Sequence, residues 1–128
     1  MGTRVRAKSH AKVNALLTRV RRLCLSLPAT SETSSWGHPN FRAGKRTFVT
    51  FERFGGVDSI AFRLHPLEVE ELERQPGFIR TPYGQGRWVS LKAEPRPAWG
   101  LVKSLVLKSY RLVALKRMVL LLENTGAA

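Results

Sequence analysis

Apolar residues recur with helical spacing near both ends of the chain. Between residues 13 and 27 they fall three or four positions apart, and Pro28 ends the run. The members of this first stripe are Val13, Leu16, Leu17, Val20, Cys24 and Leu27. A second stripe predicts a final helix over residues 98–121. Its members are Leu101, Val102, Leu105, Ser109, Leu112 and Val113. Because Lys116 falls on this same stripe, either its stem reaches out to solvent or firm packing ends near Val113.

The middle of the chain alternates apolar and polar positions, as half-buried β-strands do. Residues 47–51 and 59–64 follow this pattern on either side of Gly55-Gly56, which predicts a hairpin. Residues 31–36 and 40–42 are interpreted as one strand broken at Gly37-His38-Pro39, since proline cannot donate to a ladder. Residues 78–80 and 88–91 predict a second hairpin around the loop 83–87.

A short acidic helix separates these two groups of strands. His65-Pro66 opens it, with proline at the first helical position and four glutamates following, and Pro76-Gly77 ends it. The predicted order is therefore α-β-β-β-α-β-β-α, an α+β fold with helices packed on one face of an antiparallel sheet. We expect one domain over residues 1–128, with residues 1–8 and 123–128 as frayed tails. Cys24 should be buried on the first helix as a small hydrophobe.

The chain is strongly basic, with 22 lysines and arginines against nine acids and a net charge of +13. Such an excess indicates an anionic partner, most often nucleic acid. Arginine outnumbers lysine 15 to 7, which a GC-rich coding sequence would also produce, so a purely compositional origin of the charge stays open. The first 31 residues contain no acidic residue, as in an organellar transit peptide. Their apolar stripe nevertheless indicates a helix that belongs to the fold. With apolar runs too short to span a bilayer, we expect a cytoplasmic monomer.

Recognised catalytic and metal-binding patterns do not occur in this sequence. One cysteine excludes an internal disulfide, and the histidines lie in unrelated predicted elements without ligand spacing. Asp58 is the only aspartate and there is no nucleophile elbow, while Gly84-x-Gly86 lacks the third glycine of a dinucleotide fingerprint. His38 beside Pro39 is interpreted as structural rather than as a general base. The sequence therefore predicts no metal, no cofactor and no enzymatic activity.

The aromatic residues favour a core more than a base-stacking platform. The tryptophans and most phenylalanines alternate with polar residues, which fits burial of Trp36, Trp88 and Trp99 against the helices. Tyr83, at a loop tip, is the aromatic residue that we expect to remain exposed.

Three islands of sequence together resemble a known family. They are Trp36-Gly37-His38-Pro39-Asn40-Phe41-Arg42-Ala43-Gly44-Lys45, Pro82-Tyr83-Gly84-Gln85-Gly86-Arg87-Trp88-Val89 and Ser109-Tyr110-Arg111-Leu112-Val113. Their order and spacing, over residues 12–117, resemble the MmcQ/YjbR family of small α+β proteins. The resemblance implies a double-wing arrangement and DNA binding, and this chain matches it at Arg42, Gly44, Lys45, Tyr83 and Gly86. It also resembles the secretion-chaperone-like fold, whose members bind other polypeptides.

Basic residues gather at the predicted hairpin tips. Arg42, Lys45 and Arg46 bracket the Ala43-Gly44 turn, and Arg80 and Arg87 flank the glycine loop. Guanidinium groups at such tips can grip phosphate oxygens, so we expect a non-enzymatic nucleic-acid-binding protein, with DNA favoured over RNA. The candidate DNA-binding residues are Arg42, Lys45, Arg46, Arg80, Tyr83, Arg87, Lys12 and Arg19. Two alternatives stay open: the tips are basic only because the whole protein is, or the chain is a protein-interaction module.

Overall fold

The computed structural model describes the backbone of residues 2–124 and the side chains of residues 13–53 and 55–124. The chain begins with the long helix α1 (Gly2–Ser26), followed by four strands, which are β1 (Thr30–Ser35), β2 (His38–Ala43), β3 (Arg46–Phe54) and β4 (Val57–Arg63). The second half comprises α2 (Pro66–Glu73), β5 (Phe78–Arg80), β6 (Trp88–Lys92), α3 (Trp99–Val113) and α4 (Lys116–Asn124). Among the described residues, no helix is both long and apolar enough to cross a bilayer.

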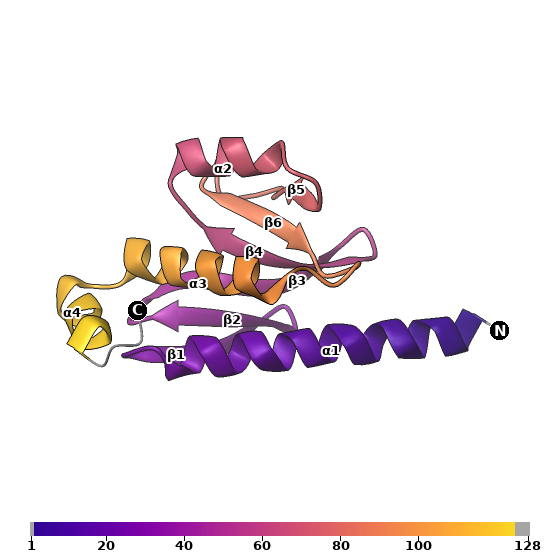
Figure 1. Ribbon diagram of the computed structural model, residues 1–128, viewed down its shortest axis with the longest axis horizontal. Coiled ribbons are helices and arrows are strands. Elements are labelled where there is room, and N and C mark those ends of the chain that lie inside the picture. Colours follow the sequence, from indigo (N-terminus) through magenta and orange to yellow (C-terminus); the bar gives the residue numbers. More distant parts are fainter. Residues whose placement is uncertain (1, 125–128) are drawn as a thin grey trace.

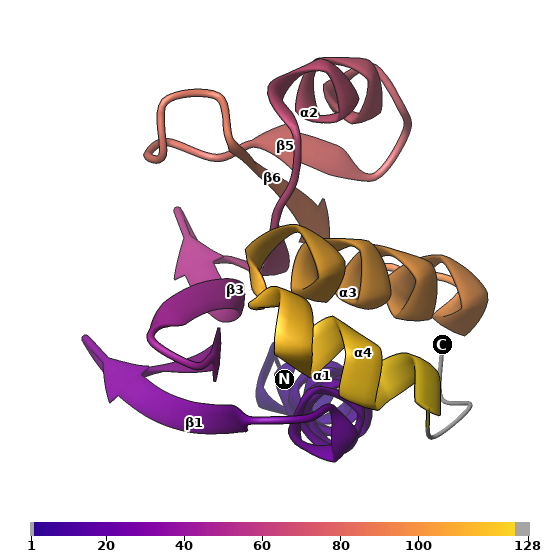
Figure 2. The same cartoon turned by 90° about the vertical axis from the view of Figure 1, so that its left-hand side faces the viewer.

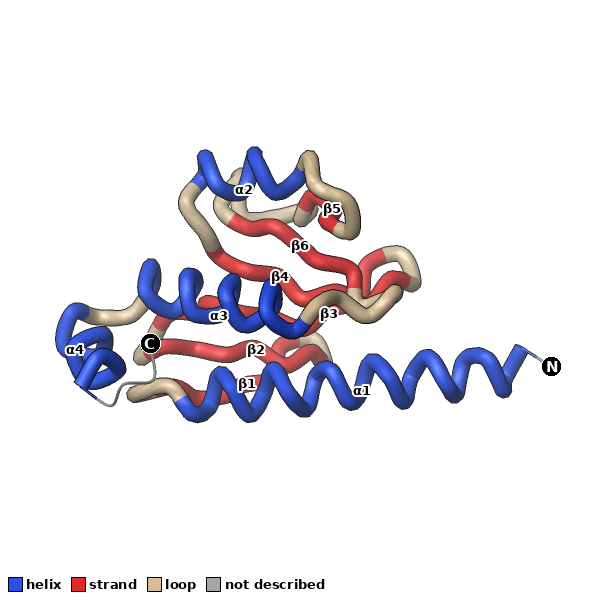
Figure 3. Tube along the Cα trace, viewed as in Figure 1, coloured by secondary structure: helices blue, strands red, loops and turns tan. Residues whose placement is uncertain are grey.

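The strands form one antiparallel sheet in the order β1-β2-β3-β4-β6-β5 (Figures 1 and 3). The helices α1, α3 and α4 lie on one side of β1–β3 (Figure 2), and α2 packs against β5 and β6. The predicted α+β class, with an antiparallel sheet and helices on one face, is therefore confirmed. One more strand and one more helix are present than the sequence pattern indicates.

The core lies between the sheet and the helices. Phe41, Val49, Phe62 and Val89 form a continuous row across four strands, and all four are fully buried. The register between β2 and β3 shifts after Phe41. Both Phe48 and Val49 are buried beside this irregularity, and such a local break in alternation is what a β-bulge permits.

Helices α1 and α3 complete this core. Val13, Leu16, Val20 and Leu27 of the first apolar stripe are buried, and Cys24 is fully buried, as predicted. Burial and the nearby Glu32 carboxylate raise the pKa of the Cys24 thiol, so the thiol is held neutral.

Tyr110 joins α3 to the rest of the core. Its ring meets Phe48 edge to face at 5.7 Å between centroids, and its hydroxyl donates to the carbonyl oxygen of Pro28 at 2.7 Å. The Ser109–Val113 island of the sequence is therefore part of the packing that links α3 to the end of α1.

The segment 31–42 is a hairpin and not a single broken strand, so that prediction was wrong. Its turn lies at Trp36 and Gly37, which have φ values of +54° and +78°. Pro39 lies inside β2, but the β2–β3 register begins at Asn40, so its missing N–H leaves no gap in that ladder. A tryptophan in the left-handed region is rare, which is why composition did not indicate the turn. Trp36 is 95% exposed, contrary to its predicted burial.

The predicted final helix is two helices. Helix α3 ends at Val113, and Ala114 is extended with φ −66° and ψ 149°. Helix α4 then starts at Lys116 and buries Met118 and Leu122. Lys116 is exposed beyond the end of α3, so of the two alternatives the firm packing of that stripe does end at Val113. The break contains neither glycine nor proline, the residues that usually mark the end of a helix, so the pattern did not predict it.

Candidate nucleic-acid interface

Three arginines line one hollow at the end of the sheet where β3 and β6 begin. Helix α4 lies near this end of the sheet (Figure 1). Arg46 is the first residue of β3, Arg63 is the last of β4, and Arg87 immediately precedes β6. Because these strands are antiparallel neighbours, the start of β3, the end of β4 and the start of β6 lie at the same end of the sheet. The three side chains line a hollow of about 380 Å³, here called the arginine hollow. Its lining residues are Arg46, Arg63, Leu64, His65, Pro66, Arg87, Leu112 and Val113.

No described carboxylate neutralises the charge of the arginine hollow. Among the described residues, none of the three guanidinium groups makes an ion pair or a side-chain hydrogen bond. By contrast, the Arg21 guanidinium lies 2.7 Å from the Glu32 carboxylate, and this hydrogen bond raises the pKa of Arg21. Unpaired guanidinium groups around one concavity favour a small anion or a phosphate group.

The loop between β5 and β6 positions Arg87. Gly84, Gln85 and Gly86 all have positive φ values, of +84°, +51° and +78°, which fold the loop back tightly. The Arg87 N–H then donates to the Gly84 carbonyl at 3.0 Å, and the Arg87 carbonyl accepts from the Leu64 N–H at 3.0 Å. The main chain of Arg87 is therefore fixed to the end of β4, while its side chain is exposed.

Tyr83 holds this loop against the sheet. Its hydroxyl donates to the Glu52 carboxylate and lies 3.4 Å from the Thr50 hydroxyl, and its ring centroid lies 6.1 Å from that of Trp88. Burial, and then the hydrogen bond to Glu52, raise the pKa of Tyr83. Tyr83 is 39% exposed, as predicted, but Trp36, at 95%, is the more exposed aromatic residue.

The β2–β3 turn contributes less free charge than the sequence suggests. The Arg42 guanidinium donates to the Lys45 carbonyl oxygen and so braces its own turn. Its Nε is buried without a partner among the described residues. Lys45 and Arg80 are exposed and make no ion pair within the described part of the chain. Of the predicted wing residues, the structure brings together only Arg46 and Arg87 around one hollow.

The cations of α1 belong to a different surface. The Arg19 guanidinium lies 4.2 Å from the centroid of the Trp99 ring, a cation–π contact that joins α1 to α3. Arg19, Arg22, Leu23, Trp99 and Lys103 line a second hollow of about 340 Å³. The side chain of Lys12, the other candidate on this helix, lies outside the described residues.

Two residues of the arginine hollow were missed from the sequence. Arg63 ends an alternating strand, where a charged residue is ordinary, and His65 precedes a proline that opens a helix. His65 Nδ1 accepts from the Leu67 N–H at 3.2 Å and so caps α2. Only the pairing of β4 with β6 brings them beside Arg87, so no local signal could have identified them.

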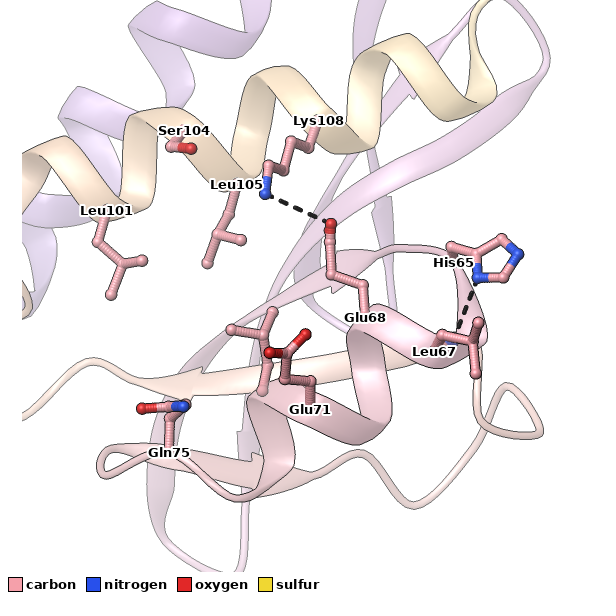
Figure 4. A pocket seen from close by; sticks show the side chains of 10 residues that line it. His65, Leu67, Glu68, Glu71, Gln75, Leu101, Ser104, Leu105 and Lys108 are labelled. Atoms are coloured by element: carbon pink, nitrogen blue, oxygen red, sulfur yellow. Dashed lines mark hydrogen bonds and ion pairs between the residues drawn. The ribbon is translucent and has the colours of Figure 1, made fainter.

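A third hollow of about 540 Å³ lies between α2 and α3 (Figure 4). Leu101 and Leu105 line it from α3, and Glu68 and Glu71 from α2 (Figure 4). An ion pair connects the two helices, since Nζ of Lys108 on α3 lies 3.4 Å from Oε1 of Glu68 on α2. The described residues contain no cluster of three histidine, cysteine or acidic side chains that could hold a metal ion.

Comparisons with known proteins agree with this architecture. The chain is 19% identical to a Deinococcus radiodurans protein with a DUF419 domain, with a TM-score of 0.65 over 86% of this chain and 87% of that one. A Pseudomonas syringae protein of known structure is 17% identical, with a TM-score of 0.58 over 66% of this chain and 86% of that one. At these identities the likeness concerns the fold alone. No curated protein matches the chain in sequence. The model of the YjbR family matches residues 25–112, well over half of the chain, and the chain therefore belongs to the YjbR family.

Proposed function

We propose that this protein binds nucleic acid, with duplex DNA as the preferred partner, through the basic end of its sheet and without catalysis. The observation that carries the proposal is the arginine hollow, where Arg46, Arg63 and Arg87 converge without any carboxylate partner in the described structure. The net charge of +13 by itself does not locate a binding surface. A cluster of three arginines at one end of the sheet is more specific than that general excess.

Phosphate contacts would supply most of the affinity. Arg46, Arg63 and Arg87 form the centre of the contact, and the exposed side chains of Lys45 and Arg80 extend the positive surface on the neighbouring turn and strand. Arginine can bond two phosphate oxygens at once, but phosphates carry no sequence information. We therefore expect weak sequence preference and, with about four to six phosphates neutralised, a log–log salt slope near −4 to −5.

A fluorescence-anisotropy titration with random-sequence duplex at two salt concentrations tests this proposal. Arg46→Ala with Arg87→Ala should weaken binding and reduce the salt slope by about 2, one for each lost phosphate contact. The matched control is Arg22→Ala with Arg96→Ala, which removes equal formal charge from exposed residues outside the arginine hollow. The control should retain most of the affinity. Equal losses from the two pairs would reject the assignment to the sheet end, and no binding at low salt would reject DNA binding itself.

A second candidate function is a protein-interaction module. It is favoured by the hollow between α2 and α3, where the partly exposed Leu67 and Leu101 lie beside the carboxylates of Glu68 and Glu71. Leu67 is 71% exposed at the edge of this hollow, a large apolar surface for a single side chain. If duplex DNA fails to bind at low salt, this surface becomes the better candidate, and Leu67→Ser should then abolish binding of the partner.

A further inference from the structure

We infer that the arginine hollow is a site for a phosphomonoester, such as the 5′-phosphate at the end of a nucleic-acid strand. This inference rests on the proposed function and deepens it, because it names the chemical group that the hollow takes. The hollow differs from an ordinary DNA-binding surface in being concave and in having arginines on three separate strand ends. A strand end can enter such a concavity, whereas the continuous backbone of a duplex can only cross its rim.

The number and placement of donors fit a terminal phosphate. A phosphodiester has one negative charge and two free oxygens, whereas a phosphomonoester carries about −1.5 to −2 charges at pH 7 and three strong acceptor oxygens. Arg46, Arg63 and Arg87 offer three guanidinium groups around one space, none of them engaged with a described carboxylate. Three guanidinium groups can therefore bind the third oxygen of a monoester and balance its additional negative charge.

The rest of the lining fits the atoms next to such a phosphate. Leu64, Pro66, Leu112 and Val113 give the hollow an apolar wall, against which a sugar or a base can pack. Its volume of about 380 Å³ lies in the range of small-ligand sites, roughly 300–1,000 Å³. His65 also lines the hollow, and because its Nδ1 accepts from the Leu67 N–H, Nε2 is the ring nitrogen left to donate.

The main chain around the hollow is fixed in advance. Leu64 N–H donates to the Arg87 carbonyl, and Arg87 N–H donates to Gly84, both at 3.0 Å. Arg63 and Trp88 are also paired in the β4–β6 register. The main chains of Arg63 and Arg87 are thus held next to each other through Trp88 and Leu64, so at these two residues phosphate binding has to order the side chains only.

The test compares one short duplex in two forms, with 5′-phosphate and with 5′-hydroxyl ends, as competitors for a labelled duplex. We expect the phosphorylated form to bind about tenfold more tightly. Arg46→Gln with Arg87→Gln should remove this preference, while Arg22→Gln with Arg96→Gln, which removes the same charge elsewhere, should keep it. Should the double variant fail to fold, Arg87→Gln alone, at an exposed side chain, should reduce the preference.

A nucleoside 5′-monophosphate, titrated alone, separates the two possible sources of the phosphate. If DNA does not bind but the mononucleotide does, and Arg87→Gln weakens that binding, the phosphomonoester site stands and the proposed DNA binding fails. If both forms of the duplex bind equally well, the inference is overturned and DNA binding stands. Failure of every phosphate compound to bind would overturn both.

Discussion

Gly84 shows how one missing side chain shapes the loop that carries Arg87. A Cβ placed on Gly84 would lie 2.2 Å from Cδ1 of Trp88, a distance that real Cβ atoms do not reach. Its φ of +84° is also a conformation that residues with a side chain rarely adopt. Because Trp88 is only 9% exposed and opens β6, it cannot move aside cheaply. Glycine is therefore required here for both steric and conformational reasons.

We predict that Gly84→Ala lowers the free energy of unfolding by about 3 kcal/mol, combining left-handed strain with overpacking against Trp88. Gly86→Ala is the matched control, since Gly86 has a similar φ of +78° but no atom near its added Cβ. It should cost only about 1–2 kcal/mol, the conformational term alone. Urea unfolding followed by tryptophan fluorescence measures both. Equal costs would show that the contact with Trp88 contributes nothing.

Helix α4 is a separate element that docks back onto the sheet end. Met118 and Leu122 are its buried residues, and the side chains between them on the sequence are mostly exposed. A Cβ on Gly44, in the β2–β3 turn, would lie 3.0 Å from Met118 Cε, so the turn and the helix are in close contact. Docking of α4 thus supports the turn that leads into Arg46 at the start of β3.

Two adjacent leucines of α4 provide a test of this docking. Leu122 is fully buried and Leu121 is 53% exposed. Leu122→Ala should lower the free energy of unfolding by about 2–3 kcal/mol, because it leaves a cavity at the edge of the core. Leu121→Ala should change it by less than about 0.5 kcal/mol. The chemical change is the same in both, so comparable values from urea unfolding would show that α4 does not pack as the structure describes.

Over the whole molecule, charge is distributed unevenly. Helix α2 carries four of the nine acids, at Glu68, Glu70, Glu71 and Glu73, whereas the first 31 residues have none. The negative charge of the chain is therefore concentrated on α2, and the excess of positive charge lies in the rest of the sequence. Inside the protein the opposite condition holds, since Cys24 and Tyr110 are buried as neutral groups.

Stability should fall at alkaline pH because three neutral groups resist ionisation in the folded protein. Burial raises the pKa values of Cys24, Tyr83 and Tyr110. The unfolded chain would release these protons near 9.0 for the thiol and 10.0 for the phenols. Above pH 9 the unfolded state therefore binds fewer protons than the folded state. The contribution of these groups to the free energy of unfolding is fully present below that pH and is lost as the pH rises.

Urea unfolding at pH 7.5, 9 and 10.5 measures this loss. For each protein, the free energy of unfolding at pH 9 and 10.5 is compared with its own value at pH 7.5. This decrease should be smaller in Tyr83→Phe, which lacks one of the three titrating groups. A free energy of unfolding that stays constant or rises up to pH 10.5 would contradict the raised pKa values of these groups in the folded protein.

The sequence by itself determined the features that arise from local periodicity. The stripe that ends at Leu27 predicted α1 and its buried Cys24, and alternation around Gly55-Gly56 predicted β3 and β4. The α+β class follows from these patterns and their order, because each amphipathic element has to bury its apolar side against another. The sequence also placed Arg46 and Arg87 beside hairpin loops, and both residues line the arginine hollow.

Only the tertiary structure decided how these elements and charges combine. Arg63 joins Arg46 and Arg87 because β4 lies between β3 and β6, a strand order that no local pattern encodes. Tertiary packing also explains the break in the predicted last helix. Helix α3 ends at Val113, and the separate helix α4 buries Met118 and Leu122. In each case the contacts join segments distant in sequence, and their free energy depends on which surfaces meet rather than on local conformational preference.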